Sequence, residues 1–278
     1  MALAAGLHFV ATPIGAARDI TLRALDILRD ADVLAAEDTR TLRHLMEIHG
    51  IPLNGRPLVA YHDHNGEAAG PRLVRAMEEG KTVAYASEAG TPLVSDPGFE
   101  LGRAAIAAGL PVLTAPGPSA VLAALTVSGL PSDRFLFAGF LPSTTSARQK
   151  ALREVADIQA TLIFYESPKR LAASLRDMAE VLGERQAVVC RELTKRFEET
   201  TRDTLPALVE AFAERAIKGE IVVLIDRAAP RQATEADVES ALRAALAHAS
   251  VKDAAAEVAA RLNLPRRDVY QMALRLSE

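Results

Sequence analysis

Hydrophobic residues along this chain fall into short continuous runs, separated by segments in which they recur at helical spacing. The runs are rich in Val, Ile, Leu and Phe and cover residues 8–12, 32–36, 58–61, 82–86, 112–114, 135–138, 161–165, 187–191 and 220–226. Continuous apolar runs are typical of strands buried on both faces, and segments 22–29, 70–79 and 99–108 have roughly helical spacing. The alternation predicts an α/β protein with largely parallel sheets.

The Pro- and Gly-dense stretch 115–119, continued by Gly129 and Pro131, interrupts this alternation near the middle of the 278 residues. A chain of this length exceeds what one core usually needs, so we place a domain boundary there. The predicted domains are an α/β domain over 1–116 and a second α/β domain over 117–230, with a ligand cleft between them.

The last segment, 231–278, contains many alanines, one proline and no glycine. Its pattern gives a helix over 251–262, a short turn, and a second helix from Arg266, which is the spacing of a helix-turn-helix. We expect a small helical module here. An ordinary helical hairpin that only packs against the rest of the protein is the alternative.

Composition narrows the function classes. The formal net charge is −4, and aromatic residues make up 4% with no Trp, which disfavours a coat protein for naked nucleic acid and extended base-stacking platforms. The single cysteine, Cys190, excludes an internal disulfide and suits a reducing cytoplasm. No stretch reaches the ~20 apolar residues of a membrane span, and no Lys or Arg precedes Arg18 as a signal peptide would need. We therefore expect a soluble cytoplasmic protein that does not contact a membrane.

Three Gly- and Pro-rich loops follow strands of the first predicted domain: 10–15, 87–98 and 115–120. In open α/β sheets ligands bind beyond the carboxyl ends of the strands, so the three loops together predict one cleft. The longest, which begins Ser87-Glu88-Ala89-Gly90-Thr91, carries the strongest signal, because so many special residues are not needed in a simple connection. None of the loops matches the dinucleotide fingerprint or a P-loop.

Charged residues follow three other predicted strands. Asp38 and Arg40 stand after the second strand, Glu166 and Lys169 after 161–165, and Lys195 after 187–191. Carboxylates there can accept a proton and cations can grip a phosphate, although helix N-termini and salt-bridged surfaces have the same composition. The pair His62 and His64 lacks a third ligand at sensible spacing, so we predict no metal site.

Seven motifs occur in an order that closely resembles the ribosomal RNA small subunit methyltransferase I family of the tetrapyrrole methylase superfamily. They are Val-Ala-Thr-Pro-Ile-Gly (10–15), Ala-Glu-Asp-Thr-Arg (36–40), Ser-Glu-Ala-Gly-Thr-Pro-Leu-Val-Ser-Asp-Pro-Gly (87–98), Pro-Gly-Pro-Ser-Ala (116–120), Gly-Phe-Leu-Pro (139–142), Phe-Tyr-Glu-Ser-Pro-Lys-Arg (164–170) and Arg-Glu-Leu-Thr-Lys (191–195). The resemblance covers about residues 6–227, and the tail is similar to that family's helix-turn-helix extension. The chain departs from the family's usual form at Glu88, where Asp is usual, and at Ala16-Ala17, where Asn-Leu is usual.

The resemblance implies a two-domain tetrapyrrole-methylase-like fold, with mixed or parallel sheets, that binds S-adenosylmethionine in the cleft. At the positions that match the family's motifs, the resemblance implies that the residues in contact with the cofactor are Pro13, Glu88, Ala89, Gly90, Thr91, Ser119, Ala120, Phe164 and Tyr165. The implied reaction is methylation of a ribose 2′-hydroxyl, which needs an aligned donor and a group that takes the hydroxyl proton. Asp38 and Glu166 are the candidates for the proton acceptor. Arg40, Lys169 and Lys195 are candidates for holding the oxyanion or a phosphate.

The acceptor implied by the resemblance is a cytidine in the decoding region of 16S ribosomal RNA, presented by the small ribosomal subunit to a homodimeric enzyme. Two alternatives remain open at this stage. One is a tetrapyrrole C-methylase with the same fold. The other is a non-catalytic nucleic-acid-binding protein that senses a ligand.

Overall fold

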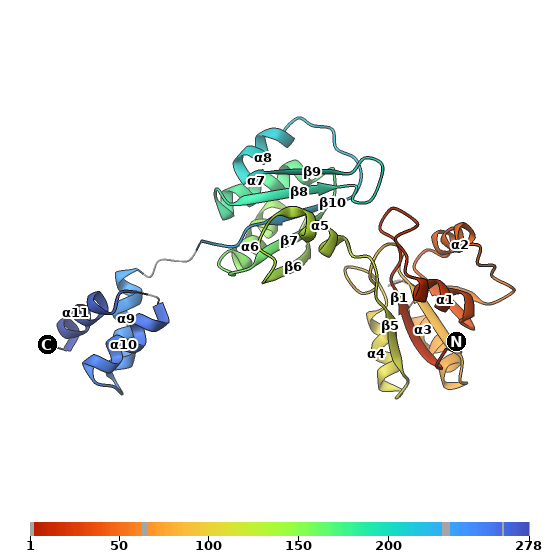
Figure 1. Ribbon diagram of the computed structural model, residues 1–278, viewed down its shortest axis with the longest axis horizontal. Helices are drawn as coiled ribbons and strands as arrows, with labels where there is room; N and C mark the ends of the chain where they lie inside the picture. Colours follow the sequence, from red (N-terminus) through yellow and green to blue (C-terminus); the bar gives the residue numbers. More distant parts are fainter. Residues whose placement is uncertain (1–2, 63–65, 230–233, 263, 278) are drawn as a thin grey trace. The chain divides into compact units, whose positions relative to one another are not determined.

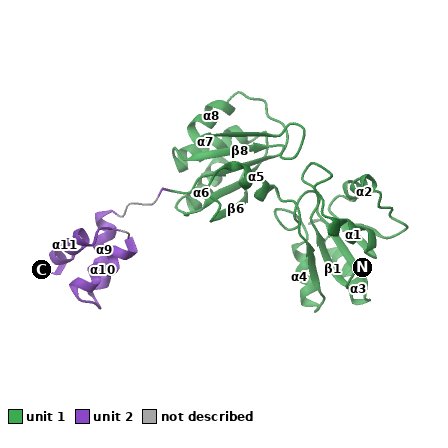
Figure 2. Cartoon of the chain, viewed as in Figure 1, with its two compact units in different colours: residues 1–228 green, residues 229–278 purple. Residues whose placement is uncertain are grey.

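The computed structural model describes residues 3–62, 66–229, 234–262 and 264–277 (Figure 1). The chain forms two compact units, residues 1–228 and residues 229–278 (Figure 2). The boundary expected at 116/117 lies inside the first unit and stays a prediction, and the one expected at 230/231 lies outside the described residues. No helix in the described part of the chain combines the length and the apolar character needed to cross a bilayer.

The first half of the larger unit is built on a parallel five-stranded sheet in the order β3-β2-β4-β1-β5. Its strands are β1 (Gly6–Val10), β2 (Val33–Ala36), β3 (Leu58–Ala60), β4 (Thr82–Ala86) and β5 (Val112–Ala115), and its helices are α1 (Leu22–Asp30), α2 (Thr39–Ile48), α3 (Gly66–Glu78) and α4 (Phe99–Ala107). Strands β1, β2 and β4 are buried along their whole length, as their continuous apolar runs predict. Because all five strands run the same way, the loops that follow them gather at one edge.

The second half contains a mixed sheet in the order β6-β7-β10-β8-β9. Its strands are β6 (Phe135–Phe140), β7 (Thr161–Glu166), β8 (Gln186–Arg191), β9 (Glu199–Thr204) and β10 (Ile221–Ile225), and its helices are α5 (Ala120–Ser128), α6 (Thr145–Val155), α7 (Leu171–Leu182) and α8 (Leu205–Phe212). Only β6 and β7 pair in parallel; β10 runs antiparallel to both of its neighbours, and β8 pairs antiparallel with β9. The predicted α/β class with parallel and mixed sheets is confirmed.

Apolar clusters cover both faces of this second sheet. One cluster joins the sheet to α6, α7 and α8 around side chains such as Phe164 and Leu175. The other joins it to α5 and includes Ile14, which comes from the loop after β1. The loop after β1 is thereby anchored on the second sheet. This contact brings the ends of the two sheets together.

The smaller unit consists of α9 (Glu235–Leu246), α10 (Val251–Leu262) and α11 (Arg266–Ser277). A capping box between Thr234 and Asp237 starts α9. Buried residues of all three helices, among them Leu242, Val258 and Val269, form its own core. The helix, turn and helix expected over 251–270 are present, with Asn263 of the turn outside the described residues.

Candidate functional site

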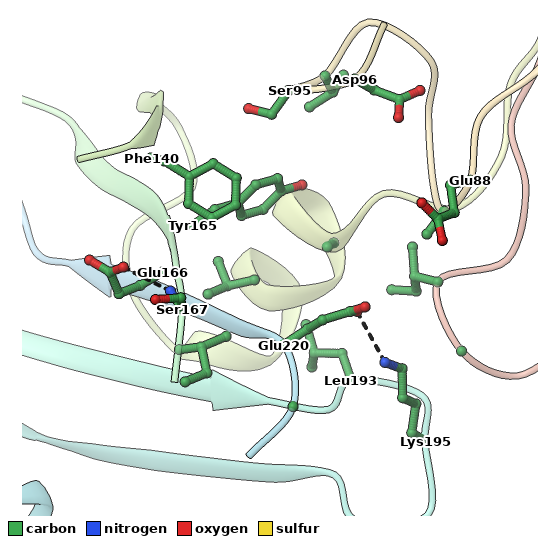
Figure 3. A pocket seen from close by; sticks show the side chains of 18 of the residues that line it. Glu88, Ser95, Asp96, Phe140, Tyr165, Glu166, Ser167, Leu193, Lys195 and Glu220 are labelled. Atoms are coloured by element: carbon green, nitrogen blue, oxygen red, sulfur yellow. Dashed lines mark hydrogen bonds and ion pairs between the residues drawn. The ribbon is translucent and has the colours of Figure 1, made fainter. Parts of the chain in front are cut away.

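A cavity of about 700 Å³ opens where the loops of the first sheet meet the ends of the second (Figure 3). A volume of this size lies within the range of pockets that bind small molecules and cofactors. Its walls come from the segments after β1, β2 and β4, the start of α5, the ends of β6 and β7, the segment after β8, and the start of β10 with the residues before it. The lining residues include Pro13, Ile14, Glu37, Glu88, Ala89, Ser95, Asp96, Ala120, Phe140, Tyr165, Glu166, Leu193, Lys195 and Glu220.

The loop after β4 is tied to its neighbours by backbone and hydroxyl hydrogen bonds. Thr12 and Gly90 exchange two backbone hydrogen bonds of 2.9 and 3.0 Å, and the Ser87 hydroxyl donates to the Gly90 carbonyl at 2.6 Å. The Thr91 hydroxyl donates to the carbonyl of Pro118 at 2.9 Å. Gly90 has φ +86°, which side-chain-bearing residues rarely adopt. Gly90 and Thr91 therefore build the loop, while Glu88 and Ala89 face the cavity.

An aromatic wall closes the cavity on the side of the second sheet. The Tyr165 ring packs edge-on against Phe137 (4.7 Å between centroids) and Phe140 (5.5 Å), and Phe140 and Tyr165 lie side by side in Figure 3. Burial raises the pKa of the Tyr165 hydroxyl, and the backbone N–H of Val121 partly offsets this by hydrogen bonding to it. The hydroxyl thus stays protonated while the ring offers an apolar surface.

The other side of the cavity is acidic. Burial, and then the charges of Glu37, Asp38 and Glu220, raise the pKa of Glu88. Lys195 lies 3.1 Å from both Glu192 and Glu220; burial lowers its pKa, but these two carboxylates outweigh that effect and raise it. An acidic environment of this kind attracts a cationic ligand and repels phosphate.

Asp38 and Arg40 lie in a neighbouring hollow that shares Glu37 and Glu88 with the cavity. Asp38 is the N-cap of α2, and its carboxylate accepts hydrogen bonds from the Arg40 backbone N–H (2.8 Å) and from the Arg40 guanidinium (2.8 and 3.2 Å). These bonds lower the pKa of Asp38 to about 2. Asp38 is therefore ionised at neutral pH and is a weak proton acceptor.

The structure brings about half of the predicted site residues to the cavity wall: Pro13, Glu88, Ala89, Ala120, Tyr165, Glu166 and Lys195. Phe164 is buried in the core behind the wall, and Lys169 is exposed and lies off it. Ser119 occupies the N-cap position of α5, but its side chain makes no capping bond, and it does not line the cavity. The roles of these residues stay predictions.

Sequence reasoning did not select Phe140 and Leu193, which both line the cavity. Phe140 stands in the Gly-Phe-Leu-Pro motif, which was the available signal. Leu193 stands in the Arg-Glu-Leu-Thr-Lys motif, which was the available signal for it. It lies in an irregular segment between Glu192 and Thr194, which have φ of +52° and +64°, so no periodic pattern indicates where its side chain points.

Comparison with known proteins settles the family. The sequence profile of the Tetrapyrrole (Corrin/Porphyrin) Methylases matches residues 6–209. The chain belongs to the tetrapyrrole methylase family. Residues 232–277 match the RsmI C-terminal HTH domain, which confirms the predicted helix-turn-helix character of the tail.

Two curated relatives narrow the family further. The Ribosomal RNA small subunit methyltransferase I of Mesorhizobium japonicum is 48% identical over 98% of this chain and 92% of its own length. The protein of that name from Halalkalibacterium halodurans is 42% identical over 96% of this chain and 93% of its own length. The chain belongs to the family that these proteins represent, as the motif resemblance predicts.

Solved structures agree with this fold. A conserved hypothetical protein from Aeropyrum pernix superposes with a TM-score of 0.63 at 18% identity, over 98% of this chain and 96% of its own. The uroporphyrin-III C-methyl transferase from Thermus thermophilus, solved in complex with S-adenyl homocysteine, gives a TM-score of 0.55 at 21% identity over 79% of this chain and 96% of its own.

Proposed function

We propose that this chain transfers a methyl group from S-adenosylmethionine to the 2′-hydroxyl of a cytidine ribose in 16S ribosomal RNA. The enzyme class, an S-adenosylmethionine-dependent ribosomal RNA methyltransferase, is that of the relatives that match almost the full chain at 40–48% identity. The ribose position, the cytidine and its presentation by an assembled small subunit are the finer parts of the proposal. A homodimeric assembly and a cytoplasmic location also belong to it.

The cavity has the chemistry that S-adenosylmethionine requires. Bound there, the cofactor supplies an electrophilic methyl group on a positively charged sulfur. Glu88 and Glu220 provide negative charge on one side, and Phe140 and Tyr165 provide an apolar wall on the other. Ala89 and Ala120 are small and let a ligand approach the backbone of the loops. These residues would bind and orient the donor and keep water away from it.

The ribose hydroxyl must lose its proton as its oxygen forms the new bond to carbon. The proton would pass to a carboxylate, and Asp38 and Glu166 stay our predicted acceptors. A pKa of about 2 weakens the case for Asp38. Of the predicted cations, Lys195 is held by two carboxylates at the cavity. The Arg40 side chain is paired with Asp38 but is 90% exposed, so it is accessible to RNA.

The smaller unit would supply RNA affinity that the acidic cavity lacks. Arg266 and Arg267 begin α11 and are exposed. Helix-turn-helix modules present the N-terminal residues of the second helix to nucleic acid, and phosphate contacts from arginines there do not depend on sequence. The module would thus dock the substrate while the larger unit performs the transfer.

Methyl transfer from isotopically labelled S-adenosylmethionine tests the proposal. Purified protein is incubated with small ribosomal subunits, with naked 16S ribosomal RNA, or with a uroporphyrinogen-type tetrapyrrole. We expect label in ribosomal RNA and none in the tetrapyrrole. Label in the tetrapyrrole alone would support a C-methylase instead, and no label in any acceptor would support a ligand-sensing protein without catalytic activity.

A paired substitution on α5 tests whether the cavity is the donor site. Ala120→Phe should fill the cavity and abolish binding of S-adenosylhomocysteine, measured by calorimetry. Leu122→Phe enlarges a side chain on the same helix that is 52% exposed and does not line the cavity, so its affinity should match the wild type. Equal affinities for the two variants would contradict the site.

A further inference from the structure

The segment Gly139–Ser143 comprises the last two residues of β6 and the start of the loop before α6, and its Phe140 forms part of the cavity wall. The β6–β7 register shifts between Phe137 and Phe140, and Gly139 has φ +67°. Phe140 is 56% exposed and lines the cavity. The ladder resumes at Phe140, which pairs with Tyr165, but no ladder pair follows it, so contacts to the residues after Phe140 also determine where its ring stands.

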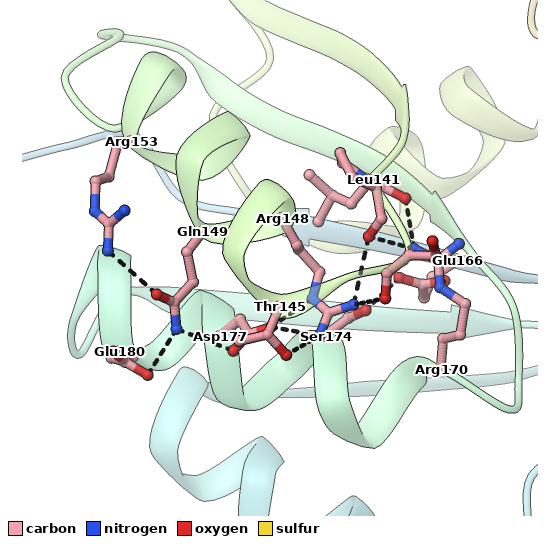
Figure 4. Close-up of polar contacts among 12 residues, drawn as sticks. Leu141, Thr145, Arg148, Gln149, Arg153, Glu166, Arg170, Ser174, Asp177 and Glu180 are labelled. Carbon is pink, nitrogen blue, oxygen red and sulfur yellow. Dashed lines mark hydrogen bonds and ion pairs between the residues drawn. The ribbon is translucent and has the colours of Figure 1, made fainter.

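Two arginines supply these contacts by binding the carbonyl groups that follow Phe140 (Figure 4). The Arg170 guanidinium donates to the carbonyls of Leu141 and Pro142, the latter at 3.1 Å. The Arg148 guanidinium donates to the carbonyls of Pro142 (3.4 Å) and Ser143 (3.1 Å). The Pro142 carbonyl therefore receives both arginines, which clamp the segment from one side.

Each arginine is itself fixed by a buried carboxylate. Arg148 forms an ion pair with Asp177, and the two side chains are only 3% and 8% exposed. Arg170 Nε lies 3.3 Å from Glu166 Oε1, and the Glu166 side chain is fully buried. An ion pair in such surroundings opposes displacement of either guanidinium group, because an unpaired charge there would be costly.

Both carboxylate oxygens of Glu166 are engaged by groups of the protein. The Ser167 backbone N–H donates to Oε1 at 2.7 Å, and the Ser174 hydroxyl donates to Oε2. In Figure 3 the carboxylate turns back to this N–H. A general base needs a lone pair within hydrogen-bond reach of the proton it takes. Here both oxygens already accept a bond from the protein, and the Glu166 side chain is fully buried.

We propose that Glu166 and Arg170 are positioning residues that hold the segment 139–143, and so place the Phe140 ring beside Tyr165 as a wall of the donor cavity. This inference rests on the proposed S-adenosylmethionine site, and it replaces the proton-accepting role for Glu166. It makes the two residues act as one unit, so loss of either should have the same consequence.

The test uses the full chain and two ligands, S-adenosylhomocysteine for affinity and labelled S-adenosylmethionine with small subunits for single turnovers. Glu166→Gln and Arg170→Gln should each weaken S-adenosylhomocysteine binding roughly three- to tenfold, as expected for one misplaced aromatic contact. The double variant should be no weaker than either single variant, because coupled residues are not additive. With saturating donor, the transfer rate should fall less than about tenfold, and Arg170→Lys should recover part of the affinity.

The matched control is Arg153→Gln. Arg153 stands at the outer end of the same network, where its guanidinium donates to the Gln149 side chain at 3.2 Å. Among the described residues, no hydrogen bond joins it to segment 139–143. Its affinity and rate should equal those of the wild type. Phe140→Ala covers the case in which the buried substitutions unfold the protein, because its ring is largely exposed; it should weaken binding by the same three- to tenfold.

A drop of about 100-fold or more in the saturated single-turnover rate of Glu166→Gln, with unchanged affinity, would identify Glu166 as the base and overturn the inference. Wild-type affinity of Phe140→Ala would overturn it as well. Failure of the wild-type protein to bind S-adenosylhomocysteine at all would instead refute the proposed function, so the two failures are distinguishable.

Discussion

Asp177→Asn should destabilise the unit of residues 1–228 by about 3 kcal/mol. Asp177 and Arg148 are 8% and 3% exposed, and the substitution leaves the Arg148 charge buried without a counter-ion. Removing one partner of a buried ion pair costs about 3–5 kcal/mol; we take the lower end because the new amide oxygen still accepts a hydrogen bond and Arg148 keeps its carbonyl partners. Urea unfolding followed by far-UV circular dichroism should show a midpoint lower by about 1 M.

Asp133→Asn is the control for that experiment. It makes the same chemical change in an ion pair with Arg227, whose side chains are 64% and 29% exposed. Exposed pairs contribute less than about 1 kcal/mol, so the midpoint should move little. If the two variants unfold at the same urea concentration, the buried pair does not stabilise the protein as we argue.

Three further predictions concern charge. The pKa of Glu88 is raised in the folded protein, so ionisation of Glu88 destabilises the folded state as the pH rises. Glu88→Gln should therefore raise the Tm at about pH 7 and leave it unchanged at about pH 3. The same change in Tm at both pH values would refute this prediction. Hydrogen bonds from Arg215, above all, lower the pKa of Glu199 to about 2, so the stability that Glu199 contributes is present above pH 4.5 and is lost as the pH falls toward 2. The Tm of Glu199→Gln, measured by thermal melts, should therefore fall less steeply over this pH range than the Tm of the wild type. Replacing Arg266 and Arg267 by Gln should reduce the slope of the logarithm of the RNA-binding constant against the logarithm of salt concentration by about one per lost phosphate contact. An unchanged slope would show that these two residues do not contact RNA phosphates.

Most of the strands could be predicted because burial on both faces leaves a continuous apolar run. The runs at 82–86 and 161–165 match β4 and nearly all of β7. Strand β9 was not predicted, because Glu199–Thr204 contains no apolar side chain and lies at the edge of its sheet, paired only with β8. The antiparallel course of β10 could not be predicted either, since an apolar run does not encode its direction.

The site was predictable to the extent that it follows from strand ends. Glu88 and Ala89 reach the cavity because the carboxyl ends of parallel strands share one edge of the sheet. The place of Phe140 on the cavity wall could not be predicted, because it depends on the register shift after Phe137, and no periodic pattern in the sequence indicates that shift. The sequence also does not reveal the partners of a charged residue at a strand end. Glu166 is a carboxylate at a strand end, as a general base would be, yet the hydroxyl of Ser174, eight residues later, donates a hydrogen bond to one of its oxygens.

The position of the transferred methyl group tests the central claim most directly. Small-subunit RNA labelled by the purified protein is hydrolysed with alkali, which cleaves after every nucleotide that has a free 2′-hydroxyl. Our account predicts that the label is recovered in an alkali-resistant dinucleotide whose first nucleoside is cytidine. Label recovered in mononucleotides would place the methyl group on a base and contradict ribose methylation.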